Sequence, residues 1–399
     1  MKRVILFSFL LILGLVLSQL TPVFFGDNFE TFKSFTDALL YITLGYIMIN
    51  VGREFEINKT QWRSYTKDYV VAMITAALPW FLVALYYIIA LPPNDAKLWQ
   101  SSDAWKEILL LSRFAAPTSA GILFTMLVVA GLKQTWVYKK IQVLAIFDDL
   151  DTIILMIPLQ IFMIGLKWQM FVILLVAIVL LILGWRKMGH YHMRQDWKSI
   201  LLYSVIIFVI IQAVYLISTA LYASEGSIHI EILLPAFVLG MIMKTKHNAS
   251  IADEKMSLNI SYLFMLLVGM SMPAFLGVDF DAIAQSTTSV ISRIPMLPWG
   301  VIMYHVFVVT VLSNLGKLAP LFFYRKRRIT ERLAVSIGMF TRGEVGAGVI
   351  FIAIGYNIGG PMVVVSVLAM ALNLVLTGFF VVFVRYLTKR AIVDSHKHL

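Results

Sequence analysis

Twelve long apolar runs constrain this chain more than any other feature of its sequence. Each run holds roughly 20 residues, the length at which an α-helix crosses the hydrocarbon core of a bilayer. Because lipid offers no hydrogen bonds to a peptide backbone, each run is predicted to be a transmembrane helix. The runs lie near residues 3–22, 34–52, 69–91, 104–131, 137–163, 168–186, 198–223, 229–245, 257–276, 297–324, 330–356 and 360–388.

The composition is typical of an all-α polytopic membrane protein. Hydrophobic residues make up 60% of the chain and charged residues 14%, with a mean hydropathy of +0.85. The net charge of +11 does not indicate a nucleic-acid partner, because nearly all of the basic excess lies in short loops between apolar runs. The absence of cysteine excludes disulfides, thiol catalysis and Cys-ligated metals.

The basic residues also predict an orientation. Most lysines and arginines lie at the N-terminus, in every second loop and in the C-terminal tail, which predicts that both termini are cytoplasmic. Arg113, Lys317 and Arg342 are the three that remain inside predicted spans. The Lys2-Arg3 start is also typical of a cleaved signal peptide, but no small-residue cleavage site follows it.

Two spans are predicted to be interrupted near mid-membrane. In the fourth span, Pro117 removes a backbone donor and disfavours helical geometry just before it. In the eleventh, residues 340–346 place two charges and two glycines at similar depth. An ordinary kink repaired by neighbouring helices would explain either break alone.

The breaks occupy matching places in two three-helix units, spans three to five and spans ten to twelve. Seven spans separate corresponding helices, and this odd number gives the two units opposite orientations. Inverted repeats with broken helices are typical of secondary transporters, whose site lies where the broken helices meet. The half-helix ends at such a site carry partial charges that ionised side chains can neutralise.

Three acids lie in the fifth span, within the sequence Phe147-Asp148-Asp149-Leu150-Asp151. A carboxylate at the bilayer centre costs several kcal/mol unless it faces a cavity or a partner. Adjacent intramembrane acids therefore indicate an ion or proton pathway.

The tenth span carries one polar stripe on an otherwise apolar helix. Thr310, Ser313, Asn314 and Lys317 fall at i, i+3, i+4 and i+7. Lys317 is close enough to the helix end to reach the cytoplasmic surface, but the stripe favours an inward position with Asp148 or Asp149 as counter-ion. His305 is interpreted as a packed or interfacial histidine.

Taken in order, four motifs resemble the cation:proton antiporter superfamily, in particular bacterial Na+/H+ antiporters with an Asp-Asp pair. The resemblance covers essentially the whole chain. Neither the acid pair nor Arg-Gly-Glu alone is specific, but their order, depth and spacing together are. The motifs are Thr118-Ser119, Phe147-Asp148-Asp149, Asn314-Leu315-Gly316-Lys317, and Gly338-Met339-Phe340-Thr341-Arg342-Gly343-Glu344-Val345.

The resemblance implies a role for each matching residue. Asp149 is expected to be the main cation ligand, and Asp148 the acid paired with Lys317. The other expected site residues are Thr118 and Ser119 for ion and proton binding, with Arg342, Glu344, Asp151, Asn314 and Asn373 in support. Residues 69–163 and 297–388 would form a moving core, and residues 1–52 and 168–276 a dimerising scaffold. No cytoplasmic regulatory domain is expected within residues 1–399.

The expected activity is exchange of Na+, or Li+, for protons across a bacterial inner membrane. A hard monovalent cation prefers oxygen ligands, and the carboxylates that supply them also bind protons, so cation binding must expel protons. Two carboxylates near one lysine favour an electrogenic exchange of two protons per Na+, and a stoichiometry of one stays open. We expect a homodimer in the lipid bilayer, no enzyme activity, no cofactor besides the transported ions, and no nucleic-acid partner.

Two features depart from the antiporter pattern. Asp151 is an extra acid one turn from Asp148, on nearly the same face of the helix. It would tune the pair, line an outward funnel, or be hydrated in the outer half of the membrane, and we favour the last. Pro117 precedes Thr118-Ser119, whereas relatives often place proline after that pair, so the backbone ligands of the first break are not fixed by the resemblance.

Other classes fit less well. An intramembrane aspartyl protease takes its two acids from separate helices with a Gly-x-Gly-Asp motif, which this sequence lacks. A sodium-coupled organic anion symporter with broken helices would need a larger amphipathic cavity. A K+/H+ antiporter differs in the ion alone, so the sequence does not separate it from a Na+/H+ antiporter.

Overall fold

The structure is a computed structural model that describes residues 2–53, 62–91, 102–164, 168–222, 232–244, 250–272, 289–356 and 358–396. The predicted site residues Asp149 and Glu344 lie in helices whose backbone is described, but their side chains lie outside the described part of the structure. Throughout the described residues the regular structure is helical, apart from an isolated bridge between Tyr191 and Met243.

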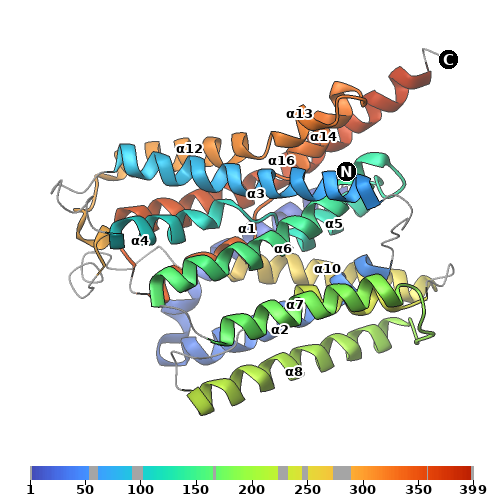
Figure 1. The fold of residues 1–399 in the computed structure, drawn as a ribbon, viewed down its shortest axis with the longest axis horizontal. Coiled ribbons are helices and arrows are strands. Elements are labelled where there is room, and N and C mark those ends of the chain that lie inside the picture. The colour runs from blue at the N-terminus through green and yellow to red at the C-terminus, as the bar shows by residue number, and fades with distance from the viewer. Residues whose placement is uncertain are drawn as a thin grey trace. The chain divides into compact units, whose positions relative to one another are not determined.

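The helices coincide with the predicted spans, and both predicted interruptions are present. Each break divides one span into two shorter helices, and a third span divides at Lys317. The α-helices are α1 (Lys2–Phe25), α2 (Phe29–Arg53), α3 (Trp62–Ala90), α4 (Ser102–Ser112), α5 (Ala120–Val129), α6 (Trp136–Ile164), α7 (Trp168–Lys187), α8 (Trp197–Tyr222), α9 (Leu233–Ile242), α10 (Ile251–Met270), α12 (Trp299–Gly316), α13 (Ala319–Phe323), α14 (Ile329–Gly338), α15 (Glu344–Gly355) and α16 (Pro361–His396) (Figure 1).

Seven stretches of the described chain are long and apolar enough to cross a membrane, and two of these combine consecutive helices. Their length and composition make this a multi-pass membrane protein. The stretches are Arg3–Phe25, Phe29–Arg53, Tyr65–Ala90, Ser102–Val129, Trp197–Ala220, Trp299–Phe323 and Pro361–Ala391.

The chain divides into two compact units. The first consists of Met1–Phe24, Arg63–Leu159 and Val268–Leu399, and the second of Phe25–Trp62 and Gln160–Leu267. The first unit therefore contains both interrupted spans and the acid-bearing helix α6, together with α12 and α16.

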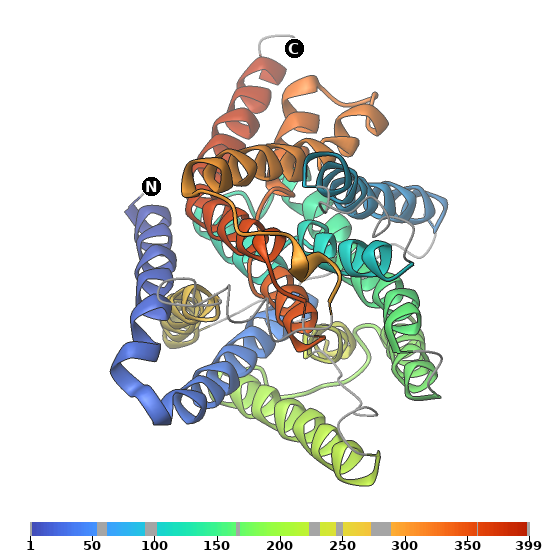
Figure 2. The same ribbon diagram turned by 90° about the vertical axis from the view of Figure 1, so that its left-hand side faces the viewer.

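Within the first unit, α16 lies against both α12 and α14 (Figure 2). Helices α3 and α12 also run side by side (Figure 1), and their backbones meet where Gly316 faces Pro79. A side chain at position 316 would collide with the backbone of Pro79, so this close crossing requires glycine. It fixes the end of α12 immediately before Lys317.

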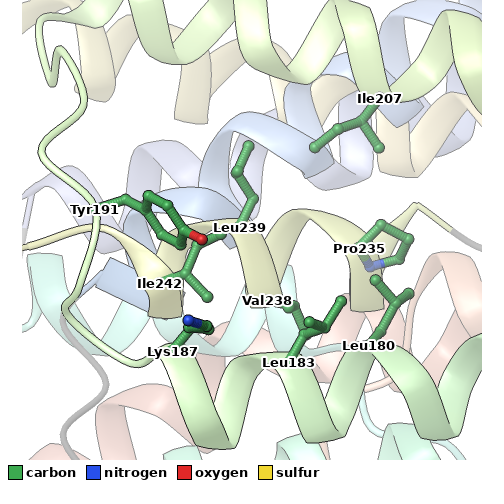
Figure 3. A pocket seen from close by; sticks show the side chains of 9 residues that line it. All are labelled: Leu180, Leu183, Lys187, Tyr191, Ile207, Pro235, Val238, Leu239 and Ile242. Atoms are coloured by element: carbon green, nitrogen blue, oxygen red, sulfur yellow. The ribbon is translucent and has the colours of Figure 1, made fainter.

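Within the second unit, α2 packs against α8 and α9. The Ser204 hydroxyl of α8 donates to the Ile42 carbonyl of α2 at 2.6 Å. A largely apolar pocket of about 370 Å³ is lined by α7, α8 and α9, with Lys187 and Tyr191 also in its wall (Figure 3). None of the predicted site residues lines this pocket.

Candidate functional site

The first break begins where α4 ends at Ser112. A short 3-10 turn, η4 (Arg113–Ala115), follows, and Ser119 then adopts an extended conformation as the N-cap of α5. Its side-chain oxygen accepts a hydrogen bond from the Ile122 N–H at 3.4 Å. Pro117 contributes to the interruption because it cannot donate a backbone hydrogen bond, although Ala116 before it keeps helical backbone angles.

The second break separates α14 from α15 and is centred on residues 339–343. It packs directly on the first break at Gly343. A β-carbon at this position would lie 2.7 Å from Ile122 Cδ1 and 2.8 Å from Ser119 Oγ, both closer than van der Waals contact. Glycine therefore permits the close approach of the two breaks, and a larger residue would displace the Ser119 and Ile122 side chains.

Backbone groups freed by the two breaks satisfy one another. The Ser119 N–H donates to the Thr341 carbonyl at 3.1 Å, and the Thr118 hydroxyl donates to the Met339 carbonyl at 3.1 Å. Irregular backbone at membrane depth is tolerated where protein partners satisfy it. These two bonds connect the broken helices of the two predicted repeats.

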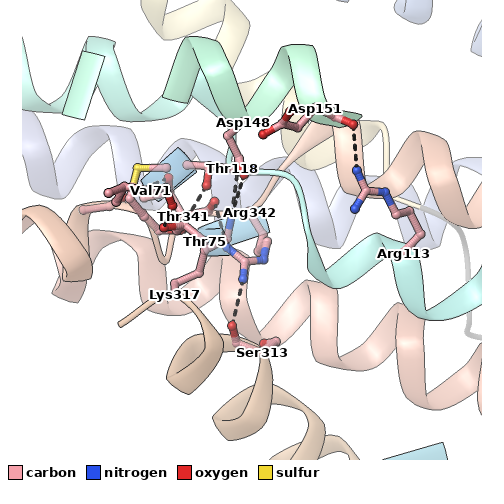
Figure 4. Close-up of polar contacts among 12 residues, drawn as sticks. Val71, Thr75, Arg113, Thr118, Asp148, Asp151, Ser313, Lys317, Thr341 and Arg342 are labelled. Atoms are coloured by element: carbon pink, nitrogen blue, oxygen red, sulfur yellow. Dashed lines mark hydrogen bonds and ion pairs between the residues drawn. The ribbon is translucent and has the colours of Figure 1, made fainter. Parts of the chain in front are cut away.

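Asp148 lies on α6 beside this junction and is fully buried. Both of its carboxylate oxygens are 3.0 Å from Lys317 Nζ, and Oδ2 also accepts from the Thr118 N–H at 2.7 Å (Figure 4). The carboxylate thus lies just before α5, where the partial positive charge of a helix N-terminus favours an anion.

Lys317 is the C-cap of α12, and its side chain has no exposed surface. It does not reach the aqueous surface, which was the alternative raised by its position near the helix end. Burying an ammonium is tolerable when it is paired and hydrogen-bonded. Asp148 supplies both interactions.

Arg342 places a second buried cation at the second break. Its guanidinium donates to the Met339 carbonyl at 3.0 Å and to the Ser313 carbonyl of α12 at 3.2 Å (Figure 4). A cation is favoured at the Met339 carbonyl because α14 ends there with partial negative charge. Arg342 therefore neutralises this helix end and links it to α12.

Two asparagines connect α12 to α16. The Asn314 side-chain amide donates to Asn373 Oδ1 at 2.8 Å, and Asn373 in turn donates to the Ala369 carbonyl at 3.1 Å. Because Asn314 precedes Lys317 by three residues, this pair helps to fix the helix end that carries the lysine.

Asp151 differs from its expected hydrated state, because its side chain is only 1% exposed. Tyr69 of α3 lies close to its carboxyl group, and Arg113 Nη2 donates to its backbone carbonyl at 3.1 Å (Figure 4). The Oδ2 atom of Asp151 has no hydrogen-bond partner within the described structure. Tyr69 and Arg113 therefore lie against the face of α6 that was expected to be hydrated. Because both residues come from segments distant in sequence, the local pattern around Asp151 did not predict their contacts.

Arg113 is a site residue to which the sequence reasoning gave no role. It is fully buried, its guanidinium lies 4.9 Å from the Trp80 ring, and two of its nitrogens have no hydrogen-bond partner within the described structure. The signal was present, since an arginine inside a predicted span marks a functional position by default.

A further buried acid lies among the described residues where α3 begins. Asp68 accepts from Lys140 Nζ of α6 and from the Tyr324 hydroxyl, each at 2.7 Å. Burial, together with the Asp68 carboxylate, raises the pKa of the Tyr324 phenol well above its ordinary value, so the hydroxyl stays protonated. These residues lie at the ends of apolar runs, where the sequence suggested only orientation signals.

Comparison with known proteins establishes the fold. Neither a protein-family model nor a curated protein sequence matches this chain. The structure is similar to that of the sodium proton antiporter MjNhaP1 from Methanocaldococcus jannaschii, with a TM-score of 0.51 and 14% sequence identity. The match covers 94% of this chain and 91% of that one. The fold class predicted from the apolar runs and the two breaks is confirmed.

Proposed function

We propose that this protein exchanges a monovalent cation, Na+ or Li+, for protons by alternating access. The observation that carries the proposal is the fully buried Asp148, which is bound to Lys317 and to the Thr118 N–H where two broken helices meet. When a cation replaces Lys317 as the partner of the buried carboxylate, the ammonium loses its counter-ion and can release its proton, so that no net charge is added to the site.

The cation would bind beside this pair. Asp149 follows Asp148 on α6 and is the proposed main ligand, with oxygen atoms of Thr118, Ser119 and the broken backbone completing a hard-cation site. The Thr118 hydroxyl and the Ser119 N–H already donate to carbonyls of the second break. The side-chain oxygens of Thr118 and Ser119 keep lone pairs with which they can coordinate a cation.

Proton coupling follows from competition for the same oxygens. A cation and a proton cannot occupy one carboxylate together, so cation binding displaces protons and proton binding displaces the cation. We propose two protons per cation, which makes the exchange electrogenic. The similarity to a sodium proton antiporter supports the reaction class, and the buried acid of this chain supports the mechanism.

We further propose the cellular arrangement. The protein would be a homodimer in a bacterial inner membrane with both termini cytoplasmic, as the distribution of basic loops favours. The broken helices with α3, α6, α12 and α16 would move, while residues 1–52 and 168–276 would form the dimerising scaffold.

The test is transport by purified protein in liposomes containing a pH-sensitive dye. We expect an inward Na+ or Li+ gradient to drive proton efflux, and Asp149→Asn to abolish it while eluting as a folded protein. Asp103→Asn, an exposed acid on α4, is the matched control. A response to K+ alone would reassign the ion, and uptake of labelled organic anions without proton movement would refute the proposal.

A further inference from the structure

Glu107 is a buried acid that the proposed exchange does not use. It lies on α4 with 7% of its surface exposed. Its carboxylate accepts three hydrogen bonds from the segment that precedes α12: from the Ser289 hydroxyl at 3.0 Å, the Val290 N–H at 3.1 Å and the Ile291 N–H at 3.0 Å. Three hydrogen bonds to one carboxylate, two of them from backbone N–H groups, make a strong, directional contact.

The same segment is attached to the start of α16. The Ser292 hydroxyl accepts from the Gly359 N–H at 2.7 Å, two residues before α16 begins. The Ser292 N–H in turn donates to Ser289 Oγ at 3.2 Å, so the two contacts share one short turn. We call residues 289–292, with Glu107 and Gly359, the Glu107 joint.

Each element held by the Glu107 joint leads to the candidate site. Helix α4 leads to the first break, and α16 carries Asn373. Helix α12 follows the joint after residues 293–298 and ends at Gly316, immediately before Lys317. Helix α12 has 18 residues, which is about 27 Å at 1.5 Å per residue. Because a packed helix moves as a rigid rod, a shift at its start displaces Lys317 relative to Asp148.

We propose that Glu107 is a positioning residue, which holds the segment leading into α12 and the start of α16 against α4 so that Lys317 stays in register with Asp148 and the first break. This inference rests on the proposed function. The Glu107 joint remains closed throughout transport, and its three elements move together.

Glu107→Gln tests the role with little change in volume. The amide oxygen can replace one carboxylate oxygen, but the NH2 group then faces a backbone N–H donor and leaves it unsatisfied. Ser292→Ala removes the bond to Gly359 at the opposite side of the joint. Asp103→Asn, on the same helix but exposed, is the matched control.

The readout is the KM for Na+ and the maximal rate in the liposome assay. Misplacement of a site by a distant substitution commonly costs about tenfold to a hundredfold, so we expect Glu107→Gln to raise KM by about tenfold, with a smaller rise in Ser292→Ala. The double variant should resemble Glu107→Gln, because both substitutions open the same joint. Asp103→Asn should leave KM within about twofold of the wild type.

A purely structural role would reduce the number of folded molecules, which lowers the maximal rate and leaves KM unchanged. That result for Glu107→Gln and Ser292→Ala would overturn the inference. If Glu107→Gln does not fold, the KM of the milder Ser292→Ala variant tests the inference: a raised KM supports it, and an unchanged KM overturns it. A wild-type protein that moves no protons in response to Na+, Li+ or K+ refutes the proposed function instead, so the two failures are distinguishable.

Discussion

Asp148 and Lys317 bury one charge of each sign with neither side chain exposed. Such a pair contributes little net stability, because the cost of removing two ions from water offsets their attraction. Removing one partner is different, since it leaves an uncompensated charge in the protein interior. The pair is therefore better explained by transport than by stability.

We predict that Lys317→Ala lowers the stability of the folded protein by about 3–5 kcal/mol, the usual cost of leaving one buried charge alone. Asp148→Asn in the same chain should recover much of that loss. Melting temperatures of the wild type, both single variants and the double variant in detergent measure the coupling. Strictly additive changes would contradict direct contact between the two side chains.

Asp151→Asn should retain exchange. Asparagine keeps the volume of the side chain, and the bond from Arg113 to the backbone carbonyl is unaffected by the substitution. We expect a modest rise in KM for the cation, because one negative charge near the path is lost. If the folded variant were as inactive as Asp149→Asn, the site would have to include a third carboxylate.

At the scale of elements, the two broken helices depend on contact between their irregular segments. The predicted interruptions followed from Pro117 and from the charges and glycines of residues 340–346, all of which are local signals. Their meeting is not local, because it brings Ser119 and Thr341 together across more than two hundred residues. Glycine at position 343 is what permits this approach.

We predict that Gly343→Ala strongly lowers exchange, because its β-carbon would overlap Ser119 and push the breaks apart. Gly348→Ala on the same helix is the matched control, since a β-carbon there meets no atom within 4 Å. The control should be neutral or stabilise the helix by roughly 0.5–1 kcal/mol. Equal transport by the two variants would show that close approach of the breaks is dispensable.

At the scale of the whole molecule, hydropathy predicted the helices because this signal is continuous along the chain. The tertiary contacts around the buried acids are not predictable from hydropathy. Asp151 was expected to be hydrated, whereas Tyr69 and Arg113 lie against it, and the local sequence around Glu107 indicated no role for that acid. Each of these depends on segments far apart in sequence, which periodicity does not encode.

The proposed orientation gives a prediction for the whole molecule. If both termini are cytoplasmic, as we propose, green fluorescent protein fused after Leu399 should fluoresce, and alkaline phosphatase at the same point should be inactive. Fusions within residues 277–296, the loop predicted between the ninth and tenth spans, should give inactive green fluorescent protein and active phosphatase. Active phosphatase at the C-terminus would reverse the assigned orientation.

The hydrogen bond from the Ser119 N–H to the Thr341 carbonyl joins two peptide groups. Any residue except proline can donate at position 119, and any residue can accept at position 341. This link therefore tolerates replacement of almost every side chain, provided that the backbones can approach. The surrounding sequence can therefore change while the contact between the two breaks is kept. This agrees with similarity of fold at 14% sequence identity.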